Sequence, residues 1–150
     1  MVRANSKSNL FFTLDYHWLK MEGFMYTIGE VAQLVGVSTH TLRYYEKENI
    51  ILPDRNEHGE RKYTESHLQW LKFVLKLKET QMPITKIKEY AVLYTEGEHT
   101  AINRLKLLED HKSSIENQIK TLKETNKMLE HKITSYKEMI LKGNEVDTNA

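Results

Sequence analysis

The chain has 150 residues, of which 39% are hydrophobic and 29% are charged, and its formal net charge is +1. It contains no cysteine, which excludes disulfides, thiolate metal sites, iron–sulfur clusters and cysteine nucleophiles. No apolar run is long enough to span a membrane, and residues 1–20 lack the long apolar region of a signal peptide. We therefore expect a cytoplasmic protein with no membrane partner.

The near-neutral charge does not by itself indicate a nucleic-acid partner. Between residues 25 and 82, eight lysines and arginines are balanced by eight aspartates and glutamates. A DNA-binding surface must therefore be argued from where the charges lie, and not from their number.

Residues 1–24 show no clear periodicity and are predicted to form an N-terminal extension. Two interpretations stay open. In one, the extension is a short segment whose apolar side chains rest on the following domain. In the other, it is a start-site artefact, because the codons for residues 21–25 can contain a purine-rich ribosome-binding sequence, and translation then starts at Met25.

A helix-turn-helix is predicted directly after this segment. Thr27 and Glu30 have the spacing of a capping box at a helix start, and Gly36 supplies the left-handed residue that ends this first helix. Ser38 then caps a second helix, expected at about residues 39–47. Two short helices joined by a tight turn are typical of DNA-binding domains, although an ordinary helical hairpin has the same spacing.

The second helix has two distinct faces. Leu42 and Tyr45 lie on its inner face. The outer face is formed by His40, Arg43, Tyr44 and Lys47. We therefore expect the outer face to be the one available to a partner.

A small β hairpin, or wing, is predicted next. Residues 54–63 are polar, rich in turn-forming types, and end on the basic and aromatic run Arg61, Lys62 and Tyr63. Thr64 starts a third helix, and Pro83 starts a fourth that Gly97 ends. We expect a winged helix-turn-helix domain at residues 25–82 and a connecting helix at residues 83–98.

The longest predicted element is a helix over residues 99–142, followed by a polar tail at residues 143–150. Its apolar residues alternate in steps of three and four across about five heptads, which is typical of a coiled coil. We expect dimerisation through the seam residues Leu105, Leu108, Ile115, Ile119, Leu122, Asn126, Leu129, Ile133, Tyr136 and Ile140. The head is too small to cover a helix of roughly 60 Å, so a partner helix is the favoured interpretation.

Five segments together resemble the MerR family of transcription regulators. They are residues 26–32, 36–38, 41–46, 61–63 and 82–88, and the Leu-Arg-Tyr-Tyr-Glu run within them is specific. Within the family, the chain resembles the short aldehyde- and stress-responsive members. It has Lys76 in the helix after the wing and no cysteine anywhere, so the thiol sensing of some of those relatives is not implied.

The resemblance implies a mainly α fold with a small β wing, followed by a two-helix region and a long dimerisation helix. It also implies a homodimer through an antiparallel coiled coil, although the seam residue Asn126 by itself favours parallel pairing. Such dimers bind palindromic promoter operators and distort the DNA, which acts on RNA polymerase indirectly.

The predicted DNA-binding residues follow from this fold. Thr39, His40 and Arg43 are expected to face bases in the major groove. Tyr44 is expected at a phosphate, and Tyr45 is expected either in the core or at the DNA. The amides of Tyr26, Thr27 and Ile28 are expected to bind a phosphate. In the wing, Arg61 and Lys62 are expected to contact the DNA backbone or the minor groove, and Arg55 is a weaker candidate for the same role. Tyr63 is expected either to pack within the protein or to contact a phosphate.

Other classes of function find little support in the sequence. The seven histidines have no metal-ligand spacing, and no phosphate-binding loop or nucleophile elbow is present. We therefore expect no enzyme activity, no cofactor and no metal ion. The alternative is a coiled-coil adaptor whose head binds protein instead of DNA.

Overall fold

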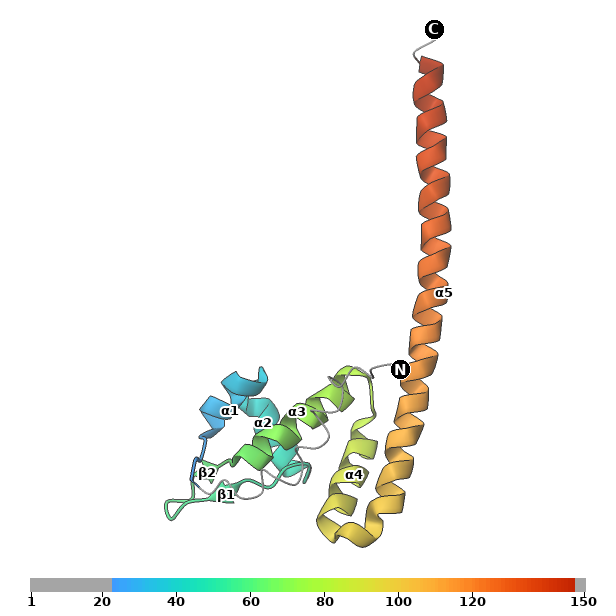
Figure 1. Cartoon of the computed structure of the whole chain (residues 1–150). Helices are drawn as coiled ribbons and strands as arrows, with labels where there is room; N and C mark the ends of the chain where they lie inside the picture. Colours follow the sequence, from blue (N-terminus) through green and yellow to red (C-terminus); the bar gives the residue numbers. More distant parts are fainter. Residues whose placement is uncertain (1–22, 148–150) are drawn as a thin grey trace, which may run out of the picture. The chain divides into compact units, whose positions relative to one another are not determined.

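The structure is a computed structural model that describes residues 23–147, with side chains described up to residue 143. Most of the predicted extension therefore lies outside the described residues. Of the predicted polar tail, residues 143–147 belong to the last helix, which ends at Asp147 and not at residue 142, and residues 148–150 lie outside the described residues. The chain divides into two units, one up to Arg104 and one from Leu105 onward. The elements in chain order are α1 (Ile28–Val35), α2 (Thr39–Lys47), β1 (Asp54–Arg55), β2 (Arg61–Lys62), α3 (Glu65–Glu79), α4 (Ile84–Glu96), the short 3-10 helix η2 (Glu98–Thr100) and α5 (Ala101–Asp147) (Figure 1). This arrangement confirms the predicted fold class.

The caps of α1 lie where the sequence predicts them. The Glu30 amide donates to the Thr27 hydroxyl at 3.3 Å, and the Thr27 amide donates to the Glu30 carboxylate at 2.7 Å. This reciprocal pair satisfies two amides that a helix start would otherwise leave open. Gly36 ends α1 with φ at 74°, a left-handed conformation that glycine adopts without the steric cost of a side chain.

The turn to α2 is closed by Ser38, whose hydroxyl accepts from the Thr41 amide at 3.1 Å. Leu42 and Tyr45 of α2 are buried, as predicted for its inner face. Core packing is therefore the role found for Tyr45.

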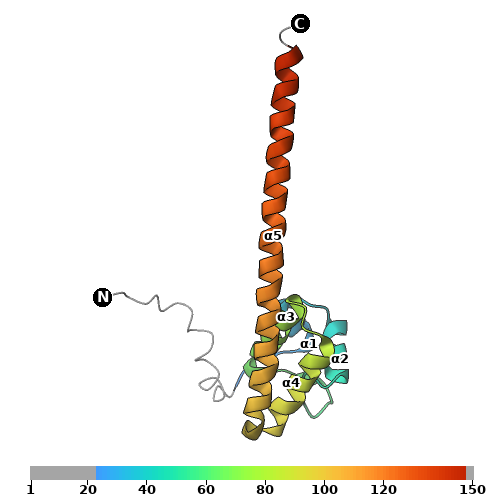
Figure 2. The ribbon, with the colours of Figure 1, turned by 90° about the vertical axis from the view of Figure 1, so that its right-hand side faces the viewer.

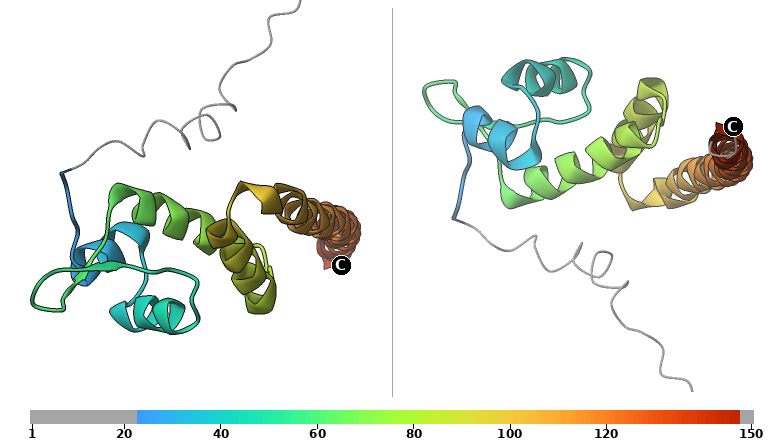
Figure 3. Two further views of the ribbon diagram at one scale, coloured as in Figure 1. Left: turned by 90° about the horizontal axis from the view of Figure 1, so that it is seen from below. Right: turned by 90° about the horizontal axis from the view of Figure 1, so that it is seen from above.

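The wing is a two-stranded antiparallel sheet in which Asp54 faces Lys62 and Arg55 faces Arg61. An isolated bridge between Tyr26 and Tyr63 connects the wing's base to the segment before α1. Contacts of α3 with α1 and with α4 link the elements of this first unit, and Figure 3 shows α3 extending from the α1–α2 pair to α4. The fully buried core comprises Tyr63, Leu42, Leu71, Ile87, Val31 and Val74. Burial of side chains of this size stabilises the fold by about 1.5–3 kcal/mol each.

Helix α4 differs from the prediction at its start, because Pro83 precedes the helix as its N-cap instead of being its first residue. Tyr90 is buried, whereas Tyr94, one helical turn further along, is 54% exposed. The Tyr94 ring stacks on Trp70 with centroids 5.5 Å apart, and the Arg104 guanidinium lies 5.4 Å from its centroid. Tyr94 therefore packs at the surface of the first unit.

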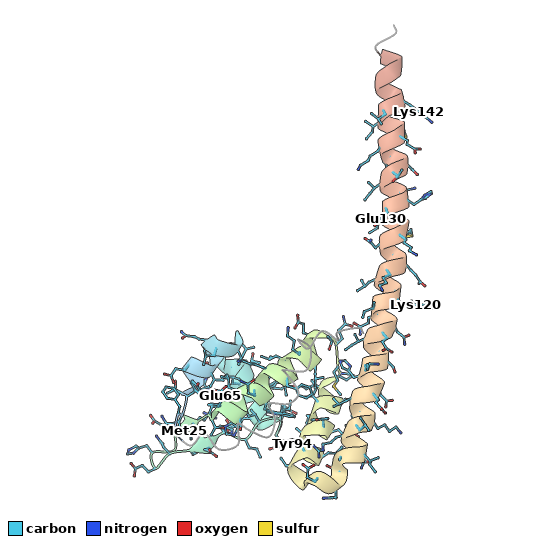
Figure 4. All side chains as sticks on the ribbon, viewed as in Figure 1. Met25, Glu65, Tyr94, Lys120, Glu130 and Lys142 are labelled. Carbon is cyan, nitrogen blue, oxygen red and sulfur yellow. The ribbon has the colours of Figure 1, made fainter. Side chains whose placement is uncertain are left out.

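The chain leaves α4 at Gly97, whose φ is 115°. The buried Thr100 hydroxyl contacts the carbonyl oxygens of Leu93, at 2.6 Å, and Gly97, at 2.7 Å. Helix α5 then runs as one uninterrupted element (Figure 2). All its described side chains from residue 119 onward are exposed, and Figure 4 marks this stretch with Lys120, Glu130 and Lys142.

Candidate nucleic-acid interface

The outer face of α2 is exposed as predicted. His40, Arg43, Tyr44 and Lys47 are exposed on the opposite side from the buried Leu42 and Tyr45. Thr39 is half-buried, and the Arg43 guanidinium lies 3.5 Å from its hydroxyl, a distance at the limit of a hydrogen bond. The arginine therefore keeps most of its donors for a partner, and it lies near the start of the helix, from which recognition helices contact bases.

The polar groups at the start of α1 form more hydrogen bonds within the protein than the sequence suggested. The Thr27 amide, predicted to bind a phosphate, donates to Glu30. This hydrogen bond, together with that of the Thr27 hydroxyl, lowers the pKa of Glu30. The Tyr26 hydroxyl donates to Glu65 at 3.1 Å, which is the main reason for its raised pKa. The Tyr26 amide donates to the Tyr63 carbonyl at 2.8 Å, so phosphate binding by the predicted amides of Tyr26 and Thr27 would replace hydrogen bonds within the protein. A phosphate at this helix start, through Ile28, stays a prediction, and it would bring a second anion close to Glu30.

Arg61 and Lys62 are consecutive residues of β2, and both are partly exposed. The Arg61 Nε donates to Glu46 of α2, and the Arg55 Nη2 donates to the other oxygen of the same carboxylate, at 2.7 Å. We call these three residues the Glu46 network. It joins both strands of the wing to the second helix of the motif.

The sequence did not predict the Glu46 network, and it indicated Arg55 only as a weaker candidate for a DNA contact. Burial by itself would raise the pKa of Glu46, but the hydrogen bonds and charges of Arg61 and Arg55 outweigh it and lower that pKa. The carboxylate is therefore ionised at neutral pH. The sequence shows an acidic residue in the second helix and two arginines in the hairpin, but nothing in it indicates that they are in contact.

Of the two roles expected for Tyr63, packing and a phosphate contact, the structure supports packing and corrects the phosphate contact. Its side chain is 0% exposed, so it belongs to the core. Burial raises the pKa of its phenol group. The hydroxyl is buried and has no hydrogen-bond partner among the described residues. The Tyr26–Tyr63 bridge holds the backbone of Tyr63 at the base of the wing, where its side chain is fully buried.

The predicted seam residues of α5 are half-exposed to exposed in the single chain. Their exposed fractions include 68% for Leu122 and 45% for Ile119. Among the other seam residues, Leu105, Leu129, Ile133, Tyr136 and Ile140 are also exposed large hydrophobics, and Leu108 and Ile115 are half-buried. An apolar stripe of this length favours association because its exposure to water is costly.

The part of the chain that the structure describes lacks two further features. It holds no group of three or more histidine, aspartate or glutamate side chains arranged to bind a metal ion. None of its helices combines the length and apolar character needed to cross a bilayer.

Two family models match the chain. The model described as MerR HTH family regulatory protein matches residues 26–92, and the model described as MerR, DNA binding matches residues 68–132. The first match includes α2 and the whole wing. The second reaches well into α5.

Three curated relatives are also described as HTH-type transcriptional regulators. An uncharacterized HTH-type transcriptional regulator of Haemophilus influenzae is 38% identical over 113 residues, which cover 74% of this chain and 83% of the relative. The regulator AdhR of Bacillus subtilis is 34% identical over 89 residues, which cover 59% of this chain and 64% of AdhR. The regulator ZntR of Escherichia coli K12 is 32% identical over 108 residues, covering 71% of this chain and 77% of ZntR.

Solved structures extend the similarity to three dimensions. The structure of HiNmlR, a MerR family regulator that lacks the sensor domain and is bound to promoter DNA, is 35% identical with a TM-score of 0.72 and covers 77% of this chain and 92% of its own. A MerR family regulator from Bacillus thuringiensis is 34% identical with a TM-score of 0.67, covering 75% and 99%. These proteins are transcription regulators, so the comparisons support a DNA-binding head and not the adaptor alternative.

Proposed function

The chain belongs to the MerR family of helix-turn-helix transcription regulators, and from this premise we propose that it binds a palindromic promoter operator as a homodimer. The observation that carries the proposal is the outer face of α2. It presents His40, Arg43, Tyr44 and Lys47 to solvent, while the rest of the helix is held in the core by Leu42 and Tyr45. A helix held in this way can enter the major groove without losing its packing.

Within the proposed complex, α2 and the wing have different tasks. Thr39, His40 and Arg43 face base edges, and the Arg43 fork suits guanine or a phosphate. Tyr44, Arg61 and Lys62 contact the DNA backbone, which fixes the position of the protein without reading the sequence. At the start of α1 the Tyr26 amide donates to the Tyr63 carbonyl and the Thr27 amide donates to Glu30, so the proposed phosphate contact there falls to the Ile28 amide.

The homodimer is proposed to form through α5. A helix with a continuous apolar seam buries that seam against a second copy, and each buried methylene contributes about 0.8 kcal/mol. We take the antiparallel direction from the family resemblance. Two positions of the seam are polar, Asn126 and Lys112, which lies between Leu108 and Ile115, and we propose that they fix its register at some cost in stability.

The regulatory step is proposed to be distortion of the promoter. Bending and untwisting a site costs on the order of 1–6 kcal/mol, which phosphate contacts from both heads of the dimer offset. The bent state then decides whether RNA polymerase engages the promoter, so polymerase is an indirect partner. This activity takes place on the nucleoid in the cytoplasm.

The experiment is a titration of a labelled duplex from the gene's own upstream region with the full chain, at two salt concentrations. We expect one specific complex with two chains per duplex, whose affinity falls steeply as salt rises because phosphate contacts release counterions. An unrelated duplex of equal length is the control. Equal affinity for both duplexes, or an affinity that does not depend on salt, would count against the proposal, and a selection from genomic DNA would then test whether the operator lies elsewhere.

A further inference from the structure

Within the part of the chain that the structure describes, Glu46 is the only residue of α2 that forms an ion pair with the wing. Its two carboxylate oxygens are divided between the strands, one accepting from Arg55 of β1 and the other from Arg61 of β2. The Glu46 side chain is 19% exposed, and those of Arg61 and Arg55 are 27% and 46% exposed. The network is therefore partly shielded from water at its acidic centre and open at its basic ends.

The two arginines use their donors differently. One terminal nitrogen of Arg55 donates to Glu46 and the other donates to the carbonyl of Gly59, at 2.9 Å, so this arginine stabilises the turn of the wing. Arg61 uses only its Nε, and within the described residues its two terminal nitrogens make no hydrogen bond. A guanidinium held at Nε keeps a pair of parallel donors whose plane is fixed, which is the geometry that binds a phosphate in a bidentate manner.

An alternative role for Glu46 is to neutralise the wing. One carboxylate between two guanidinium groups leaves a net charge of +1, so the network still attracts phosphate, although less strongly than two free arginines would. The two roles predict opposite effects when Glu46 is removed. Loss of a neutralising acid strengthens DNA binding, and loss of a residue that orients Arg61 weakens it.

We propose that Glu46 is a positioning residue of the DNA-binding surface, which holds the Arg61 fork at a fixed place relative to α2. The distance from the groove contacts of α2 to the phosphate that Arg61 binds then becomes part of operator recognition. The proposal rests on the proposed function, because it assigns a role within the same DNA-binding surface.

The test is a double-mutant cycle on DNA affinity in the full chain, using the variants Glu46→Ala, Arg61→Ala and both together. We expect Glu46→Ala to weaken operator binding on the order of tenfold, and the double variant to bind no more weakly than Arg61→Ala, because Glu46 acts through Arg61. Footprinting should show that Glu46→Ala loses protection at the wing phosphate and keeps protection in the groove that α2 occupies. A merely structural role would weaken both regions together.

Glu57→Gln is the matched control, because it removes one acid from the exposed turn of the wing. We expect it to leave binding unchanged or to strengthen it slightly. Thermal unfolding is measured for each variant, and if Glu46→Ala does not fold, Glu46→Gln takes its place, since its amide oxygen still accepts from one arginine. Stronger binding by the Glu46 variant, or losses that add independently in the double variant, would overturn the proposal while the proposed function stands. Absence of operator binding by the wild-type chain would overturn both.

Discussion

The ammonium group of Lys88 in α4 lies 2.5 Å from a carboxylate oxygen of Glu48, the residue that caps the end of α2. The two residues are 40 positions apart in the chain. The hydrogen bond to Glu48 is the main reason why the pKa of Lys88 is raised. This ion pair therefore ties the end of the proposed recognition helix to α4.

Replacing Lys88 by methionine should weaken operator binding and slightly lower the melting temperature at low salt. Both effects should shrink at high salt, because solvent ions screen a partly exposed pair. Lys86→Met is the control, since Lys86 pairs with Glu89 within α4 itself. Equal effects of the two variants on DNA affinity would contradict the assigned role of the Lys88–Glu48 pair.

Tyr63→Phe tests the assignment of this side chain to the core. The hydroxyl is buried without a partner among the described residues, and a buried unpaired hydroxyl costs about 1–3 kcal/mol. We expect Tyr63→Phe to keep or raise the free energy of unfolding, measured by urea denaturation, and to leave operator affinity unchanged. Tyr63→Ala should lower that free energy by about 3–5 kcal/mol, as large truncations in cores do.

Tyr44→Phe is the matched comparison, because Tyr44 is exposed on the outer face of α2. It should weaken DNA binding several-fold and leave stability unchanged. If Tyr63→Phe weakened operator binding as Tyr44→Phe does, at unchanged stability, Tyr63 would have to contact the DNA after all.

Stability should depend on pH through His67. Its Nδ1 accepts from the Thr64 amide at 3.0 Å and completes the cap of α3, which requires a neutral ring. Burial is the main reason why its pKa in the folded chain lies below the ordinary value of 6.5. The unfolded chain therefore binds the proton more readily, so this contribution to stability is fully present above pH 6.5 and is lost as the pH falls from there through the folded-state pKa.

The free energy of unfolding, measured by urea denaturation at a series of pH values from about 7.5 to 5, should fall more steeply in the wild type than in His67→Gln. Glutamine at this position keeps an acceptor for the cap but does not titrate. The other histidines contribute to both proteins alike, so the difference isolates His67. Parallel pH profiles would rule out the assigned role.

Alanine substitutions of Arg43 and Lys62 should have different effects on DNA binding. Arg43→Ala should cost about 1–3 kcal/mol of operator affinity and relax the preference at the base pair it contacts. Lys62→Ala should weaken binding to all duplexes alike, and it should lower the number of counterions released on binding, read from the salt dependence of the affinity, by about one. Titration of both variants against operators with single base changes distinguishes these outcomes, and a uniform loss with Arg43→Ala would assign it to a phosphate instead.

Self-association should depend on the seam of α5. Leu122→Lys removes a seam side chain worth roughly 1.5–3 kcal/mol from each copy, and we expect the dimer to weaken by at least about a hundredfold in sedimentation equilibrium. Thr121→Lys adds the same charge outside the seam and should leave the mass at two chains. A monomeric wild type, or equal weakening by both variants, would contradict the proposed coiled coil.

The parts of the fold that the sequence predicted well depend on neighbours in the chain. The Thr27–Glu30 capping box, the left-handed Gly36 and the Ser38 cap each need only a few adjacent residues, so their positions were confirmed. The inner face of α2 followed from helical periodicity for the same reason.

The details that the sequence could not predict depend on tertiary packing. Glu46 and Arg61 are 15 positions apart, and their contact depends on the register and direction of the wing. Tyr63 follows a strand of only two residues, too short for alternation to tell which face it takes. Tyr90 and Tyr94 lie one helical turn apart and both stack on Trp70, but only Tyr90, whose ring also lies against Phe73, is buried.

Footprinting of the wild-type chain on its own upstream DNA, with dimethyl sulfate for guanines in the major groove and hydroxyl radicals for the backbone, tests the central claim most directly. We predict two protected half-sites related by a two-fold axis, each with groove protection that Arg43→Ala removes and flanking backbone protection that Lys62→Ala weakens. A single asymmetric site, or protections that neither variant changes, would contradict a dimeric regulator that binds DNA through α2 and the wing.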